Sequence, residues 1–155
     1  MRPIRRRCAR ASDGPADVDK SGALIDTSVL LDYLLADKRA QRAIGSYAHR
    51  SISVVTWLEL MALCPPATLE PTRGFLRTFE RLSINESIAD AALLLGQRKP
   101  GLSVAQALTW ASAQVNQLVY VTADARHVAP SDRNVVVPYR WDAAPAGRRA
   151  AKAAA

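Results

Sequence analysis

Short apolar runs alternate with longer segments of helical periodicity through the middle of this chain. The short runs predict five strands, at residues 23–25, 51–53, 82–84, 118–121 and 135–137. The longer segments predict helices at 29–35, 38–47, 54–63 and 71–81, after Asn85, and from Ser103. Strands that alternate with helices favour an α/β fold of three layers, α/β/α, around a short, mostly parallel sheet.

Two acids follow predicted strands directly. The run 23–25 stops at Asp26, and the run 118–121 is followed by Thr122 and then Asp124. Open α/β sheets bind ligands at the carboxyl ends of their strands, so both acids are expected at such an edge. Each also has a structural alternative: Asp26 is a good helix N-cap, and Asp124 suits an Asx turn.

A third acid lies within an apolar helix. Glu59 is the only charged residue in the segment 54–63, which is apolar enough to be expected largely buried. A buried carboxylate needs a partner or a metal ion. The alternative for Glu59 is a salt bridge to an arginine.

The remaining acids and the two histidines carry less weight. Asp32 is at most a secondary pairing residue, and Asp90 lies off the apolar stripe of its helix and is expected in solvent. His49 and His127 are expected to be exposed loop residues. The chain contains no Gly-rich phosphate loop, no G-x-S-x-G and no Cys/His pair at a telling spacing.

Three carboxylates from separate elements suit a hard cation such as Mg²⁺ or Mn²⁺. Such a site activates water and neutralises charge at a phosphodiester. We therefore predict that Asp26, Glu59 and Asp124 are metal ligands and catalytic residues.

The charge of the chain is concentrated at its two ends. Of the net charge of +7 over 155 residues, residues 1–22 carry +3 (six Arg or Lys, three Asp) and residues 143–155 carry +3 (three Arg or Lys). Residues 23–142 hold twelve Arg or Lys and eleven Asp or Glu, hence +1. We expect one folded domain at 23–142 between a disordered basic extension and a flexible basic tail. These arms either bind phosphates or are solvated tails.

Cysteine use and hydropathy bear on the compartment. The chain has two cysteines, at positions 8 and 64, and no disulfide framework or zinc motif. It also has no apolar run near the ~20 residues of a membrane span. We expect a cytoplasmic protein that does not contact the membrane.

Four segments together resemble the PIN domain, and within it the VapC-type toxins of prokaryotic toxin–antitoxin pairs. The resemblance covers about residues 23–141 and rests on Ile25–Leu31, Ser51–Leu60, Leu118–Asp124 and Val135–Tyr139. In these segments Asp26, Glu59 and Asp124 match the first, second and last acids of the family. Thr27, Ser28 and Thr122 stand beside these acids and are assigned supporting positions.

The resemblance implies an endoribonuclease that depends on Mg²⁺ or Mn²⁺ and acts on an RNA substrate. It also implies a homodimer, and inhibition by a small VapB-like antitoxin whose tail covers the active-site groove.

One position departs from the family pattern. Relatives usually carry an acid at the start of the helix after the Gly-Leu turn, and Gln106 stands there instead. Gln106 removes one negative charge, and with Ser103 it completes a Ser-x-x-Gln capping box. The hypotheses are thus a ribonuclease toxin weakened by Gln106 or, alternatively, an inactive PIN fold that binds an antitoxin or RNA.

Overall fold

The computed structural model of the protein describes residues 22–141. Expectations for the two basic arms therefore lie outside the described residues. The elements run in the order β1 (Gly22–Ile25), α1 (Thr27–Leu34), α2 (Lys38–Gly45), β2 (His49–Ser53), α3 (Val54–Leu63), a 3₁₀ turn η1 (Pro66–Thr68), α4 (Leu69–Leu76), β3 (Glu80–Leu82), α5 (Glu86–Arg98), α6 (Val104–Val115), β4 (Val119–Val121) and β5 (Val135–Val136).

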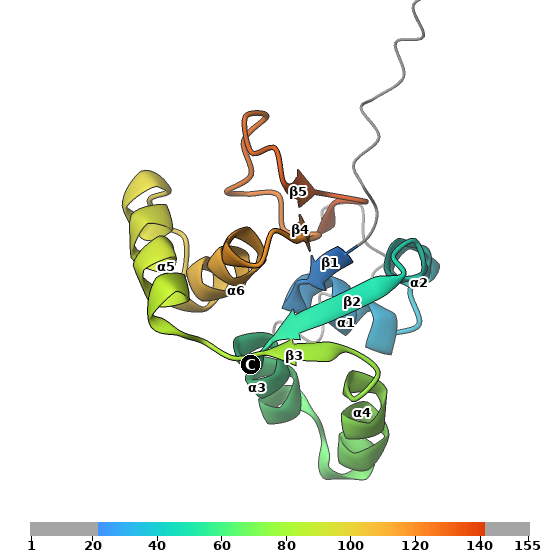
Figure 1. The fold of residues 1–155 in the computed structure, drawn as a ribbon. Coiled ribbons are helices and arrows are strands. Elements are labelled where there is room, and N and C mark those ends of the chain that lie inside the picture. Colours follow the sequence, from blue (N-terminus) through green and yellow to red (C-terminus); the bar gives the residue numbers. More distant parts are fainter. Residues whose placement is uncertain (1–21, 142–155) are drawn as a thin grey trace, which may run out of the picture.

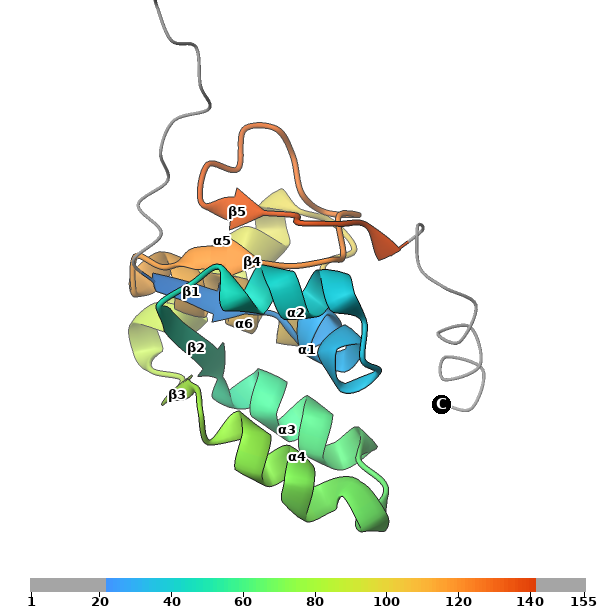
Figure 2. The ribbon, with the colours of Figure 1, turned by 90° about the vertical axis from the view of Figure 1, so that its right-hand side faces the viewer.

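The five strands form one parallel sheet in the order β3-β2-β1-β4-β5. Helices cover both faces of the sheet (Figures 1 and 2). The predicted α/β/α fold is therefore confirmed. β1 lies in the centre, with β2 on one side and β4 on the other, so the order in which the strands are added switches sides at β1. Ligands bind at such a topological switch point, outside the carboxyl ends of the strands.

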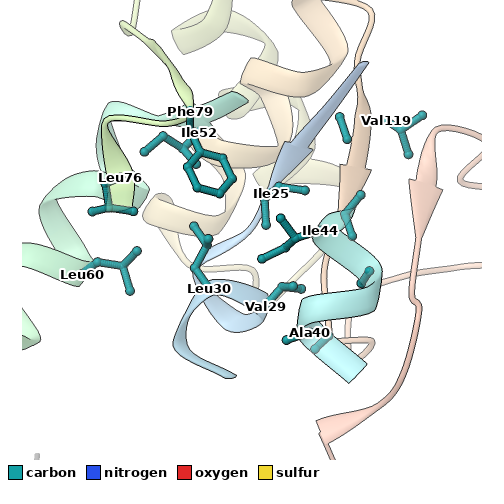
Figure 3. Close-up of a cluster of buried hydrophobic side chains, with 14 residues drawn as sticks. Ile25, Val29, Leu30, Ala40, Ile44, Ile52, Leu60, Leu76, Phe79 and Val119 are labelled. Atoms are coloured by element: carbon teal, nitrogen blue, oxygen red, sulfur yellow. The ribbon is translucent and has the colours of Figure 1, made fainter. Parts of the chain in front are cut away.

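The first face of the sheet packs against α1 and α2. Ile25 of β1 and Val121 of β4 are fully buried there together with Val29, Leu30 and Ile44 from the two helices. Figure 3 shows the same cluster continuing to Leu60 of α3, Leu76 of α4 and Phe79 of the turn after α4. This layer fixes the start of α1, and thus the direction in which the residues after β1 project.

The second face packs against α5 and α6. Leu24 and Tyr120, which alternate with the residues of the first face, lie against Ile88 and Leu95 of α5 and Trp110 of α6. The rings of Trp110 and Tyr120 stack with centroids 5.3 Å apart. A strand buried on both faces lacks polar alternation, which explains why β1 and β4 are short continuous apolar runs.

Two boundaries in the middle of the chain were predicted wrongly. The helix expected at 71–81 corresponds to α4, which ends at Leu76. The strand expected at 82–84 corresponds to β3, which begins two residues earlier, at Glu80. Phe79 is 6% exposed and anchors a turn between the two elements. That turn lets Glu80–Leu82 pair with Ser51–Ser53 of β2, and the strand pairing overrides the local helical pattern.

The expected burial of α3 was also too high. Thr56 and Leu60 are buried, whereas Leu58 and Leu63 are each 56% exposed. α3 and α4 form a pair that projects from the edge of the sheet (Figure 2), so only one side of α3 meets the core. Within residues 22–141, no helix combines the length and apolar character needed to cross a membrane.

Candidate active site

Asp26 is both a helix cap and a pocket residue. It is the N-cap of α1 and is 6% exposed. Its Oδ2 accepts hydrogen bonds from Ser28 Oγ at 2.6 Å, from Thr122 Oγ1 at 2.9 Å and from the Ser28 backbone N–H at 3.3 Å. The capping alternative is therefore correct, and it leaves Asp26 at the carboxyl end of β1, where the pocket opens. Ser28 and Thr122 hold this carboxylate in one orientation.

Glu59 reaches the same place from α3. The Thr27 hydroxyl donates a hydrogen bond to Glu59 Oε2, and Thr56 Oγ1 lies 3.3 Å from Thr27 Oγ1. Burial raises the pKa of Glu59, the Thr27 hydrogen bond lowers it, and the nearby Asp26 charge raises it further. In the part of the chain that is described, no ion pair involves Glu59, so the salt-bridge alternative is wrong.

Asp124 follows β4 and is 8% exposed. Its backbone N–H donates to Thr122 Oγ1 at 3.1 Å. Arg126 holds its carboxylate on both oxygens, with Nε 2.9 Å from Oδ1 and Nη2 2.6 Å from Oδ2. This ion pair lowers the pKa of Asp124 despite its burial, and the hydrogen bond from Gln106 lowers it further.

Gln106 uses both ends of its amide. The capping box predicted with Ser103 is present: Gln106 N–H donates to Ser103 Oγ at 3.1 Å, and Ser103 N–H donates to Gln106 Oε1 at 3.2 Å. The other end, Nε2, donates to Asp124 Oδ2 at 3.0 Å. A carboxylate at position 106 could accept the hydrogen bond from Ser103 N–H but could not donate one to Asp124.

One open pocket of about 290 Å³ joins these residues. The predicted residues that line it are Asp26, Thr27, Ser28, Glu59, Gln106 and Asp124. Thr122 supports Asp26 from beneath the pocket. Among the other lining residues, sequence reasoning missed the charged Arg126 and the aromatic Trp141. The D-x-R spacing of Asp124 and Arg126 was the available signal for the first, whereas no pattern pointed to Trp141.

The ligand types in the pocket fit a hard divalent cation, because every candidate donor is an oxygen atom. The positions of these oxygen atoms, however, do not yet form a complete metal site. Among residues 22–141, no group of three acidic, histidine or cysteine side chains is close enough to hold a metal ion. Asp124 is occupied by Arg126 and Gln106, and Glu59 by Thr27. The metal-binding role of the three acids therefore remains a prediction.

The other acids and histidines considered from the sequence lie elsewhere. Asp32 is buried and accepts a hydrogen bond from Tyr139 Oη at 2.8 Å, in keeping with a pairing role. Asp90 is exposed on α5, and His49 is exposed at the start of β2. His127 is half-buried, contrary to expectation, and its carbonyl accepts a hydrogen bond from Lys99.

Comparisons with known proteins identify the family of the chain and structures that share its fold. The family model of the PIN domain matches residues 23–131. A solved toxin–antitoxin complex from Klebsiella pneumoniae contains a chain that is 30% identical, with a TM-score of 0.71; the match covers 76% of this chain and 98% of that one. A comparison with curated proteins gives no match.

Two more distant structures share the fold. DNA-bound VapBC from Salmonella typhimurium matches at 18% identity and a TM-score of 0.60, covering 69% of this chain and 89% of that one. FitAcB from Neisseria gonorrhoeae matches at 20% identity and a TM-score of 0.55, covering 66% and 88%. At these identities the likeness concerns the fold alone.

Proposed function

Because this chain belongs to the PIN domain family and resembles VapC-type members of toxin–antitoxin complexes, we propose that it is an endoribonuclease toxin that uses Mg²⁺ or Mn²⁺. The observation that carries the proposal is the convergence of three carboxylates from separate elements on one pocket at the switch point of the sheet. Asp26 comes from the end of β1, Glu59 from α3 and Asp124 from the loop after β4.

In this proposal Asp26, Glu59 and Asp124 hold the metal ion. A bound Mg²⁺ or Mn²⁺ would supply an activated water and neutralise charge on the phosphodiester. Thr27 favours the ionised form of Glu59, which a cation requires. Ser28 and Thr122 orient Asp26. Arg126, whose side chain is 65% exposed at the mouth of the pocket, is available to an RNA phosphate.

The proposed partners follow from the relatives. The 30% identical chain belongs to a toxin–antitoxin complex, which supports a small VapB-like antitoxin for this chain. We further propose a homodimer that acts on cytoplasmic RNA. Aliphatic side chains exposed on α3 and α5, among them Leu58 and Leu93, would suit burial in such assemblies.

A second candidate function is supported by Asp124. Gln106 replaces a family acid, and Gln106 and Arg126 together surround the Asp124 carboxylate. A pocket arranged in this way suits an inactive PIN fold that binds an antitoxin or RNA. The two functions differ in their need for a metal ion.

Cleavage of a single-stranded RNA pool by the purified protein tests the proposed function. We expect products to accumulate slowly with Mn²⁺, no products with EDTA, and loss of this cleavage in Glu59→Gln. Glu86→Gln, on the exposed first turn of α5, is the matched control for purity and folding. Cleavage that persists undiminished in Glu59→Gln would contradict the proposed role of Glu59. If the metal-loaded protein binds RNA without cutting it, the binding-module function replaces the enzyme.

A further inference from the structure

The Asp124 carboxylate already has a full set of hydrogen-bond donors. Oδ1 accepts from the Arg126 backbone N–H at 3.2 Å and from Arg126 Nε at 2.9 Å. Oδ2 accepts from Arg126 Nη2 at 2.6 Å and from Gln106 Nε2 at 3.0 Å. A carboxylate offers about four lone-pair sites, so these four donors fill it. Asp124 can join a metal site only when a donor leaves.

The two side chains that hold Asp124 differ in how easily they can leave. Gln106 is fixed at its other end by the capping box with Ser103. Arg126 has a side chain that is 65% exposed, and the described side-chain contacts of its guanidinium are all with Asp124. Its movement into solvent breaks one ion pair, with two side-chain hydrogen bonds, from a largely exposed position, which makes Arg126 the more mobile of the two partners.

We propose that Arg126 is a built-in counter-cation of Asp124, which an RNA phosphodiester withdraws so that the carboxylate can bind the divalent ion. The inference rests on the proposed function and adds a regulatory step to the same site. A guanidinium presents the same two parallel N–H donors to a phosphate as to a carboxylate, so Arg126 exchanges one bidentate anion for another.

The exchange makes RNA and metal binding cooperative. In the free protein Arg126 competes with the metal ion for Asp124, and in the RNA complex that competition is removed. By linkage, RNA must raise metal affinity by the same factor as the metal raises RNA affinity. Without RNA the cation binds more weakly, so metal binding is favoured in the substrate-bound state.

Mn²⁺ titration by calorimetry on the intact protein tests the competition directly. Arg126→Ala should bind Mn²⁺ about fivefold or more tightly than the natural protein, within the usual range of such couplings. Arg126→Lys keeps the charge but lacks the two parallel N–H donors, so its Mn²⁺ affinity should lie between those of Arg126→Ala and the natural protein. Arg73→Ala is the matched control, because Arg73 also forms an ion pair, with Glu70 on α4, and does not line the pocket.

Fluorescence anisotropy with a labelled 2′-O-methyl RNA oligonucleotide, checked for integrity on a gel, tests the linkage. Mn²⁺ should raise oligonucleotide affinity about fivefold in the natural protein and in Arg73→Ala, and the factor should approach one in Arg126→Ala. Equal Mn²⁺ affinity of Arg126→Ala and the natural protein overturns the inference while the proposed function stands. If no form binds Mn²⁺, including the double variant Arg126→Ala with Gln106→Asp, the proposed function fails and the inference fails with it.

Discussion

The Thr27 hydroxyl donates a hydrogen bond to Glu59 Oε2 and so joins the first residue of α1 to the middle of α3. Among the described residues, Thr27 is the hydrogen-bond donor to the Glu59 carboxylate. Burial and the Asp26 charge both raise the pKa of this carboxyl and so favour its neutral form. A donor to an ionised carboxylate has the opposite effect and favours the charge. Thr27 therefore sets the ionisation of a proposed ligand without needing to contact the metal.

Thr27→Val should raise the pKa of Glu59 further above its ordinary value of 4.5, because it removes the donor and keeps the shape of the side chain. A cation binds the ionised form of Glu59. As the pH is lowered, Thr27→Val should therefore lose Mn²⁺ affinity at a higher pH than the natural protein does. NMR titration of the Glu59 carboxyl carbon measures the first effect, and calorimetry between about pH 5 and 7 measures the second. Thr27→Ser, which keeps the hydroxyl, should behave like the natural protein. An unchanged titration in Thr27→Val would show that Thr27 does not set the pKa of Glu59.

Asp26→Asn should abolish metal binding and nuclease activity and leave the fold intact. The asparagine carbonyl can still accept the bonds from Ser28 and Thr122, so the cap of α1 survives the loss of charge. The melting temperature should stay within a few degrees, or rise slightly, since clustered carboxylates repel each other. Asp90→Asn, on the exposed side of α5, is the control. A folded Asp26→Asn protein with unchanged Mn²⁺ affinity would contradict the assignment.

Much of the fold was predictable because local signals and tertiary packing agree. α3 spans Val54–Leu63, as the sequence indicates, and the Ser103–Gln106 capping box forms as expected. Asp26 was placed at the end of β1 because a carboxylate is too costly to bury inside an apolar strand and therefore marks where the strand stops. β3 was misplaced because its residues are mostly exposed and gain strand structure only from pairing with β2.

The candidate site was less predictable than the fold. Proximity of Asp26, Glu59 and Asp124 depends on the order of the strands, which no local pattern of residues gives. The ion pair of Arg126 with Asp124 forms in a loop, where no periodicity indicates which way a side chain points. Trp141 enters the pocket from beyond β5, and its position depends on how the last segment crosses the domain. Such contacts arise from tertiary structure and leave no local pattern.

The Arg126–Asp124 pair should also give the metal-free protein a pH-dependent stability. The folded-state pKa of Asp124 is lowered below its ordinary value of 3.8. Its stabilising contribution is therefore present above that value and is lost as pH falls through the folded pKa. Arg126→Ala should lower the free energy of unfolding at neutral pH by less than about 1 kcal/mol, because the guanidinium is largely exposed. The melting curves of the two proteins should converge below pH 3.8, and a constant difference down to low pH would show that Arg126 acts by packing.

Deletion of residues 1–22 tests the basic extension, which lies outside the described residues. If its arginines hold RNA phosphates, the shortened protein should bind RNA more weakly. Its affinity should also depend less steeply on salt, by about 0.7 in logarithmic slope for each lost contact with a single strand. Anisotropy titrations at several salt concentrations measure both effects. If RNA affinity and its salt dependence are unchanged, the extension is a solvated tail that does not bind RNA.

The last prediction concerns Gln106, whose amide donates to the Asp124 carboxylate. We expect low or undetectable cleavage at millimolar Mg²⁺ in the natural protein. Gln106→Glu keeps the side-chain length and can still accept the Ser103 N–H, whereas Gln106→Asp is too short for that bond but is favoured near a helix N-terminus. Either substitution adds a fourth negative charge to a partly buried pocket.

Both variants should therefore bind Mn²⁺ at least about tenfold more tightly, or about 1.4 kcal/mol, and should cleave RNA faster. The same change should lower the melting temperature of the metal-free protein, because a donor to Asp124 becomes a second carboxylate beside it, and Mn²⁺ should restore the loss. Gln114→Glu adds the same charge on the exposed side of α6 and should do neither. Calorimetry, thermal melts and RNA cleavage on the four proteins decide the matter. If the natural protein cleaves as fast as the Gln106 variants, three acids suffice, and Gln106 then serves only to cap α6 and orient Asp124.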